Sequence, residues 1–179
     1  ILNQSLKQRK DNIFINNFEI NKINIKKFNS IFQRRINNEP LSKIIKQKEF
    51  YSLNFYVTNK VLDPRPETEF IIDAVKKYFP NFNKKIKICD LGTGSGCLAV
   101  TLAKIYKNSN ILATDISFEA INIAKRNAKK HKVLNQIEFI KCNWINKKEK
   151  FDLIVSNPPY LTKNDYQNCS KEIKNFVNF

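Results

Sequence analysis

A short proline-rich segment near the end of the chain carries residue types that could hold a weakly nucleophilic nitrogen, namely Asn157-Pro158-Pro159-Tyr160. The nitrogen of an amide, or of an amino group on an aromatic ring, is a poor nucleophile because its lone pair is delocalised. The Asn157 side-chain oxygen and the Pro158 carbonyl could both accept hydrogen bonds from such an NH2 group and fix its orientation. The prolines stiffen the segment, and the Tyr160 ring offers a face to a planar group. We interpret these four residues as catalytic and substrate-binding.

A glycine-rich loop lies upstream of this segment, with the sequence Asp90-Leu91-Gly92-Thr93-Gly94-Ser95-Gly96. It follows the short apolar run 86–90 and precedes a helical pattern. Glycines let the backbone turn sharply and approach a ligand. The N-terminus of a helix favours a carboxylate or a phosphate. The loop alone therefore fits either a nucleotide or an amino-acid-like cofactor.

The order Asp-Leu-Gly-x-Gly-x-Gly resembles the first motif of class I methyltransferases, and this resemblance implies S-adenosylmethionine as the cofactor. It identifies most of the loop as cofactor-binding: Asp90, Gly92, Thr93, Gly94, Ser95 and Gly96. Asn157 is expected to contact the cofactor as well. A Rossmann-type dehydrogenase is not excluded by the loop alone.

Three further residues follow the next two predicted strands. Asp115 stands where an acidic side chain accepts hydrogen bonds from both ribose hydroxyls, and the alternative is a cap for the helix that begins near Ser117. In class I methyltransferases the position of Asn143-Trp144 contacts the adenine, so the resemblance implies the same here. The alternative for Trp144 is packing in the core.

An alternation of strands and helices from residue 86 onward would position these groups. We expect strands at 86–90, 110–115, 136–142 and 151–156, and helices at 96–107 and 117–131. This rhythm predicts βαβ units and a parallel sheet, hence an α/β, Rossmann-like fold. The Asn157 segment would then lie at the carboxyl edge of the sheet, beside the glycine-rich loop.

The part of the chain before residue 80 has a different pattern. Apolar residues at helical spacing predict a helix over 24–37, which should end at Glu39-Pro40. The aromatic, partly alternating run 49–57 predicts a strand or a hairpin. A second helix should begin near Thr68 and end at Pro80, with the boundary to the alternating part at 80–85.

Three upstream segments, together with the Asn157 segment, closely resemble the HemK/PrmC family over residues 34–167. They are Arg34-Arg35-Ile36-Asn37-Asn38-Glu39-Pro40-Leu41, Glu49-Phe50-Tyr51-Ser52-Leu53 and Pro64-Arg65-Pro66-Glu67-Thr68-Glu69. Members of this family methylate the side-chain nitrogen of the glutamine in the Gly-Gly-Gln motif of peptide chain release factors, which act in translation termination. The resemblance therefore implies a protein-(glutamine-N5) methyltransferase.

By this resemblance, residues 1–48 are the remnant of a helical domain that docks the release factor, and 49–66 form a hairpin linker. Residues 67–179 are the cofactor-binding catalytic domain. Arg65 and Glu67 would bind the substrate, with a salt-bridged helix start as the alternative. The chain departs from the family pattern at three positions, where a Tyr, a Gly and an apolar residue are usual: Lys43, Lys46 and Asp63.

The ends of the chain suggest a fragment. It begins at Ile1 and contains no Met, and only four strands of the sheet are expected within its 179 residues. A doubly wound sheet usually has more strands than four. We therefore expect the C-terminal strands of the sheet to be missing, and the N-terminus to be cut.

Composition and charge leave two rival functions open. The net charge of +16 favours an anionic partner, and the tetrapeptide also occurs in enzymes that methylate adenine N6 or guanine N2. The lysines are spread along the chain, however, so nucleic acid is expected only as an indirect partner. The second rival is an inactive module that binds the cofactor or a partner.

The remaining expectations are mostly absences. No apolar run is long enough for a membrane span, and no signal peptide is visible, so we expect a cytoplasmic protein, acting as a monomer. The four cysteines and the single histidine show no zinc-ligand spacing, so no metal is expected.

Overall fold

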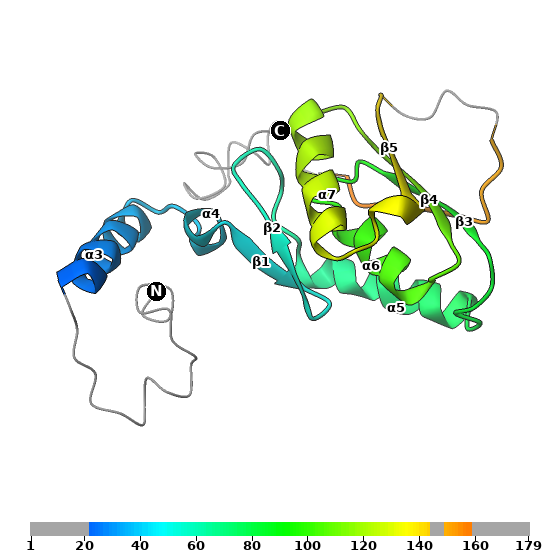
Figure 1. Cartoon of the computed structure of the whole chain (residues 1–179), viewed down its shortest axis with the longest axis horizontal. Coiled ribbons are helices and arrows are strands. Elements are labelled where there is room, and N and C mark those ends of the chain that lie inside the picture. The colour runs from blue at the N-terminus through cyan, green and yellow to red at the C-terminus, as the bar shows by residue number, and fades with distance from the viewer. Residues whose placement is uncertain (1–21, 144–148, 159–179) are drawn as a thin grey trace.

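The computed structural model describes residues 22–143 and 149–158. Its elements are, in chain order, α3 (Lys22–Ile36), α4 (Leu41–Ile45), β1 (Gln47–Phe50), β2 (Leu53–Tyr56), η1 (Pro66–Thr68), α5 (Glu69–Tyr78), β3 (Lys87–Leu91), α6 (Cys97–Ile105), β4 (Asn110–Asp115), α7 (Phe118–Lys130), η2 (Leu134–Gln136), β5 (Ile137–Lys141) and β6 (Leu153–Ser156) (Figure 1). None of these helices is long and apolar enough to cross a membrane.

Within the described residues, the central sheet has four parallel strands in the order β5-β4-β3-β6. In the register, Asp90 of β3 lies between Ala113 of β4 and Val155 of β6. The strand that follows each helix runs parallel to the one before it, as a βαβ unit requires. The predicted α/β fold with a parallel sheet is confirmed, and β4 has the predicted bounds of 110–115.

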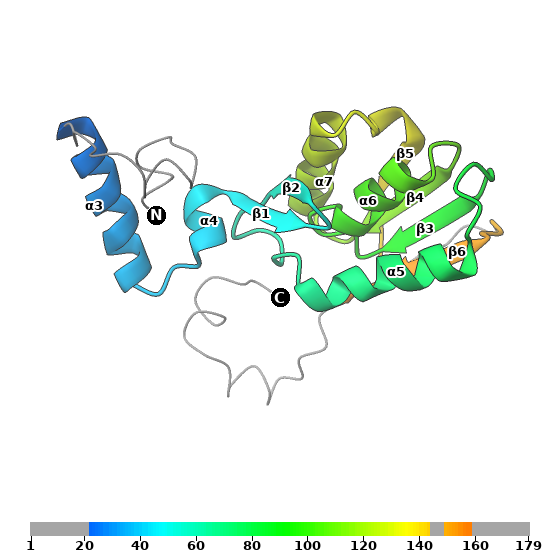
Figure 2. The ribbon, with the colours of Figure 1, turned by 90° about the horizontal axis from the view of Figure 1, so that it is seen from below.

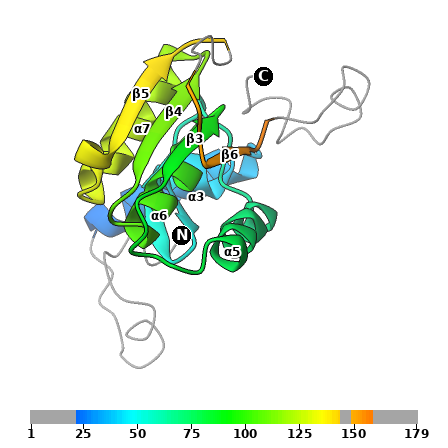
Figure 3. The same cartoon turned by 90° about the vertical axis from the view of Figure 1, so that its right-hand side faces the viewer.

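The core lies between this sheet and its helices. Helices α6 and α7 pack against the strands, and α5 lies beside α6 on the same face (Figure 3). The most deeply buried side chains include Ile88, Val100, Leu102 and Tyr106. Burial of each large aliphatic side chain stabilises the fold by about 1.5–3 kcal/mol. On β6 the period of two is visible, because Val155 is buried in this core while Ile154 is 57% exposed.

Helix α7 begins as its sequence predicts. Ser117 has extended backbone angles, and its hydroxyl accepts a hydrogen bond from the Ala120 N–H at 3.2 Å. This satisfies one of the N–H groups that have no partner within the helix. The cap fixes the first turn of α7 directly after Asp115, the last residue of β4.

The run predicted as a strand or hairpin forms a hairpin of β1 and β2 (Figure 2). Its two turn residues, Tyr51 and Ser52, have φ of 48° and 59°, the left-handed values that a tight hairpin turn requires. The Glu69 carboxylate, at the start of α5, accepts a hydrogen bond from the Tyr51 N–H at 2.8 Å. Glu69 therefore fastens the tip of the hairpin to the rest of the fold.

Helix α4 was not predicted. It begins after Pro40, whose fixed φ suits a helix start, and has only five residues. Its C-cap is Lys46, with a φ of 56°. This left-handed conformation explains why a glycine would suit position 46. In Figure 2, α3 and α4 lie at the end of the hairpin away from the sheet.

Candidate functional site

A cavity of about 330 Å³ opens at the carboxyl edge of the sheet, and we call it the edge cleft. Segments from five places in the chain line it: Lys60, Val61, Leu62, Leu91, Gly92, Gly94, Thr114, Asp115, Ile116, Ser117, Ala120, Cys142, Asn143, Ser156, Asn157 and Pro158. Its position is the one where ligands bind in parallel α/β sheets. Its volume lies in the range of small-molecule sites, about 300–1,000 Å³.

The glycine-rich loop lines part of the edge cleft. Gly94 has a φ of 56°, and a side chain there would be strained. Gly96, with a φ of 79°, lies against helix α7, where an added Cβ would come within 3.0 Å of the Ala124 Cβ. Gly92 is open, with no atom within 4 Å of an added Cβ. The loop is thus closed toward α7 and open toward the cleft.

Asp90 lies behind the loop and does not line the edge cleft. It is 1% exposed, and its Oδ2 accepts hydrogen bonds from the Thr93 hydroxyl at 2.6 Å and the Ala99 N–H at 3.2 Å. Burial raises the pKa of Asp90 to about 6, although these two hydrogen bonds oppose the rise. Asp90 therefore fixes the loop and the first turn of α6.

The raised pKa of Asp90 predicts how stability depends on pH. The folded protein keeps a proton that the unfolded chain releases from its ordinary pKa of 3.8 upward. Asp90 therefore destabilises the fold progressively as pH rises from about 4 through about 6. Asp90→Asn keeps one oxygen for Thr93 and Ala99 and cannot ionise. As pH rises over this range, the free energy of unfolding of Asp90→Asn, measured with denaturant, should increase relative to that of the parent. A difference that stays constant with pH would exclude this role.

Asp115 joins the loop to the start of α7. Its Oδ2 accepts a hydrogen bond from the Gly94 N–H at 2.9 Å, and its Oδ1 accepts one from the Ser117 N–H at 2.9 Å. Ser117 and not Asp115 is the N-cap of α7, and the contact from Asp115 holds the backbone N–H of that N-cap residue. Each carboxylate oxygen has further lone-pair capacity, and the side chain lines the edge cleft. The contact with Ser117 and a ligand contact can thus coexist.

Asn157 lies directly after β6, which β3 separates in the sheet from β4 and its Asp115, and both residues line the edge cleft. Its side-chain NH2 donates a hydrogen bond to the Thr68 hydroxyl at 2.7 Å. Thr68 is buried at the end of η1. The amide is therefore oriented with its NH2 toward Thr68. Its carbonyl oxygen accepts no hydrogen bond from the part of the chain that the structure describes.

The other predicted site residues divide into three groups. Gly92, Asn143 and Pro158 line the edge cleft with Gly94, Asp115 and Asn157. Thr93, Ser95 and Gly96 lie in the loop but do not line it. Trp144, Pro159 and Tyr160 lie outside the described residues.

Arg65 and Glu67 are exposed, and neither lines the edge cleft. Among residues 22–143 and 149–158, neither forms an ion pair with a described partner. Instead, the contacts of this segment come from Thr68 and Glu69. The substrate role of Arg65 and Glu67 stays a prediction.

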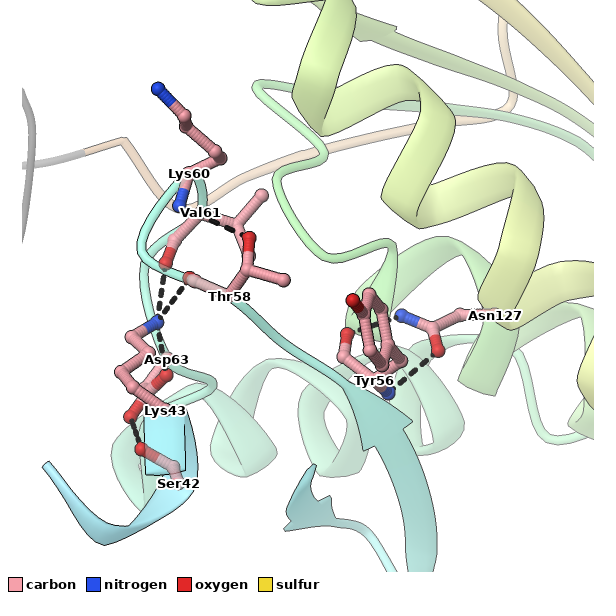
Figure 4. A network of polar contacts seen from close by, with 8 residues as sticks. All are labelled: Ser42, Lys43, Tyr56, Thr58, Lys60, Val61, Asp63 and Asn127. Atoms are coloured by element: carbon pink, nitrogen blue, oxygen red, sulfur yellow. Dashed lines mark hydrogen bonds and ion pairs between the residues drawn. The ribbon is translucent and has the colours of Figure 1, made fainter. Parts of the chain in front are cut away.

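Asn127 is a central polar residue that the sequence analysis missed. It is 0% exposed, in the middle of α7. Its Oδ1 accepts from the Tyr56 N–H at 2.7 Å, and its Nδ2 donates to the Tyr56 carbonyl at 2.9 Å and to the Ser95 carbonyl at 2.8 Å. Figure 4 shows the pair of bonds to Tyr56. Asn127 thus joins the hairpin to the glycine-rich loop.

Replacing Asn127 with alanine should lower the free energy of unfolding by about 2–3 kcal/mol, because buried backbone groups of Tyr56 and Ser95 lose their partner. The matched control is Asn122→Ala, on the exposed face of the same helix, with an expected change within about 0.5 kcal/mol. Denaturant unfolding measures both values. Equal losses in the two variants would show that the contacts of Asn127 are not stabilising.

The edge cleft suits an elongated cofactor with a polar and an apolar end. Backbone at Gly92 is open to a ligand, Asp115 supplies a carboxylate, and Ile116, Ala120 and Leu62 supply apolar surface. No group of three or more His, Cys, Asp or Glu side chains that could hold a metal ion occurs among the described residues.

Comparisons with known proteins agree with this architecture. A family model described as methyltransferase small domain matches residues 59–177. A release factor glutamine methyltransferase of Buchnera aphidicola subsp. Baizongia pistaciae is 39% identical over 175 residues, covering 97% of this chain and 62% of that protein. A bifunctional methyltransferase of Rickettsia bellii is 38% identical over 185 residues, covering 88% of this chain and 33% of that protein. The chain thus spans between a third and two thirds of these relatives.

The fold is also found in a solved structure, the N-terminal domain of human METTL16 in complex with SAH. The TM-score is 0.53 at 20% identity, and the match covers 74% of this chain and 56% of that one. This likeness concerns the fold, a Rossmann-like sheet with its helices.

Proposed function

Because the chain belongs to the methyltransferase small domain family, we propose that it is the cofactor-binding part of an S-adenosylmethionine-dependent enzyme that methylates the Gly-Gly-Gln glutamine of peptide chain release factors. The methyl acceptor is the side-chain amide nitrogen of that glutamine. The observation that carries the proposal is the Asn157 side chain, which lines the edge cleft, donates its NH2 to Thr68, and has an oxygen that accepts no hydrogen bond from the described residues. The similarity to the release factor glutamine methyltransferase of Buchnera supports the choice of substrate.

The proposed cofactor site uses the groups that line the edge cleft. Asp115 would accept hydrogen bonds from the ribose hydroxyls, and Gly92 and Gly94 let the backbone approach the amino-acid part. Ile116 and Asn143 would border the adenine. S-adenosylmethionine supplies a methyl group on a positively charged sulfur, which a nitrogen lone pair can attack.

The chain's own contribution to the reaction is positioning. The Asn157 oxygen and the Pro158 carbonyl would accept the two N–H groups of the glutamine amide and so place its nitrogen at the methyl group. Two acceptors on one NH2 also fix the rotation of the amide, so that its nitrogen faces the methyl group. The new N–C bond would form as the S–C bond breaks, S-adenosylhomocysteine would leave, and the proton lost from the nitrogen would pass to water. No general base is needed in this scheme, so the acceleration comes from orientation.

Thr68 joins the Pro64–Glu69 segment to Asn157 in this scheme. Its hydroxyl accepts a hydrogen bond from the Asn157 NH2, and in this scheme the bond would keep the Asn157 oxygen free to accept from the substrate. The Pro64–Glu69 part of the resemblance would therefore act on the reaction through Thr68. Arg65 and Glu67, which are exposed beside it, would contact the release factor at the rim.

The rival substrate is an adenine or guanine amino group in nucleic acid, favoured by the net charge of +16. Transfer of a labelled methyl group from the cofactor to release factor, compared with RNA and DNA, separates the two. We expect label in the release factor alone. Label in nucleic acid alone would overturn the choice of substrate, and cofactor binding without any labelled product would indicate an inactive module.

A further inference from the structure

Lys43 is a buried lysine outside the edge cleft. Its side chain is 3% exposed, on the short helix α4. Its Nζ donates hydrogen bonds to the Thr58 carbonyl at 2.7 Å and to the Val61 carbonyl at 2.6 Å (Figure 4). It also forms an ion pair with Asp63 at 2.5 Å. An ammonium group has three N–H donors, so this cation is well matched to its surroundings.

All three partners of Lys43 belong to one segment, residues 58–63, which we call the 58–63 loop. The loop has no helix or strand. Its own backbone contributes a weak turn, in which the Val61 N–H donates to the Thr58 carbonyl at 3.3 Å. Asp63 is held in turn by the Ser42 hydroxyl, also on α4. The loop therefore depends on contacts from α4 for its conformation.

The 58–63 loop is at the same time a wall of the edge cleft. Lys60, Val61 and Leu62 line the cleft together with residues of the glycine-rich loop and Asp115. Lys43 itself does not line it. Lys43, from the N-terminal part of the chain, thus helps to fix the position of the 58–63 loop at the edge cleft.

We propose that Lys43 is a positioning residue that clamps the 58–63 loop against the cofactor and so couples helix α4 to cofactor binding. The proposal rests on the proposed function for the identity of the cofactor. Burial disfavours the charged form of a lysine and lowers the pKa of Lys43, while Asp63 opposes that shift. The ion pair with Asp63 therefore stabilises the charged form of Lys43 at its buried position. A neutral side chain of the same length would fill the space without holding the two carbonyls.

The test is Lys43→Met in the intact protein, with S-adenosylhomocysteine as the probe, measured by calorimetry at a temperature where circular dichroism shows the variant folded. We expect its Kd to rise about tenfold, since two hydrogen bonds from a charged donor no longer hold the wall. Hydrogen exchange of the 58–63 amides should speed up as well. The matched control is Lys77→Met, an exposed lysine of α5, which should change neither measurement.

Asp63→Asn separates the clamp from the ion pair. It leaves the two carbonyl contacts of Lys43 in place, so its Kd should rise less than that of Lys43→Met. If Lys43→Met does not fold, Lys43→Leu, which also lacks a donor for the two carbonyls, takes its place, with the same expected order of the Kd values.

Two outcomes would overturn the proposal. One is a folded Lys43 variant whose Kd and 58–63 exchange match the parent, and the other is an equal change in Lys77→Met. A parent protein that does not bind the probe would instead contradict the proposed function, so the two failures are distinguishable.

Discussion

Replacing Asn157 with alanine is expected to lower kcat for methyl transfer by about 100- to 1,000-fold while leaving the Kd of the cofactor within about threefold. The reason is the position of the side chain. Its NH2 donates to Thr68 at 2.7 Å, the residue lines the edge cleft, and in the proposed mechanism its oxygen accepts the substrate N–H. Alanine removes the acceptor for the substrate N–H but leaves the glycine-rich loop and Asp115 unchanged.

The measurements for Asn157 are single-turnover methyl transfer to release factor and calorimetric binding of S-adenosylhomocysteine. Asn122→Ala, on the exposed face of α7, is the matched control and should keep both values. Thr68→Val should lower kcat by a smaller factor, because Asn157 is then free to turn, and Thr68→Ser should restore it. Unchanged turnover in Asn157→Ala would refute the proposed mechanism.

Asp115→Asn is expected to raise the Kd of the cofactor by about 100-fold. Both oxygens of the carboxylate already accept backbone N–H groups, from Gly94 and Ser117. An amide in this place must turn its NH2 toward one of these donors, so the glycine-rich loop or the start of α7 loses its anchor. The amide also offers the ribose hydroxyls one oxygen in place of two.

Calorimetry with S-adenosylhomocysteine measures the effect of Asp115→Asn. The matched control is Asp73→Asn, the same change on the exposed side of α5, away from the edge cleft. Its Kd should equal that of the parent. If Asp115→Asn binds the probe as tightly as the parent does, Asp115 has a structural role only and is no part of the cofactor site.

The sheet and its helices could be predicted from the sequence because their signals are local. The apolar run 110–115 and the Ser117 cap each need only neighbouring residues to be recognised, and both are confirmed. The short helix α4 has only five residues and so shows no period to detect. Its stability comes from packing, which a single sequence does not display.

The polar contacts behind the site were harder to predict, although one had a signal. Asn127 stands in the buried stripe of α7, at helical spacing from Ala120, Ile123, Ala124 and Ala128. A polar residue at a core position usually has buried hydrogen-bond partners, so the sequence pattern of α7 predicts such partners for Asn127. Asp90 was interpreted as a cofactor contact, yet it lies behind the loop and not in the cleft. Its residue type is compatible with both places.

Lys43 and Asp63 show the limit of position-by-position comparison. Each departs from the family pattern, and each could be taken as an isolated change in the linker. In the structure they are partners in one ion pair. The sequence separation of Lys43 and Asp63 does not predict this ion pair, because the conformation of the hairpin between them determines whether the two side chains meet.

The central claim, methylation of a glutamine amide with Asn157 as the acceptor that orients it, is tested most directly by tandem mass spectrometry. Release factor is incubated with the intact protein and S-adenosylmethionine, and the peptide that carries Gly-Gly-Gln is sequenced. One added methyl group on the glutamine side chain is predicted, and it should be missing when Asn157→Ala is used. An unmodified glutamine, with the methyl group on another residue or on nucleic acid, would contradict the claim.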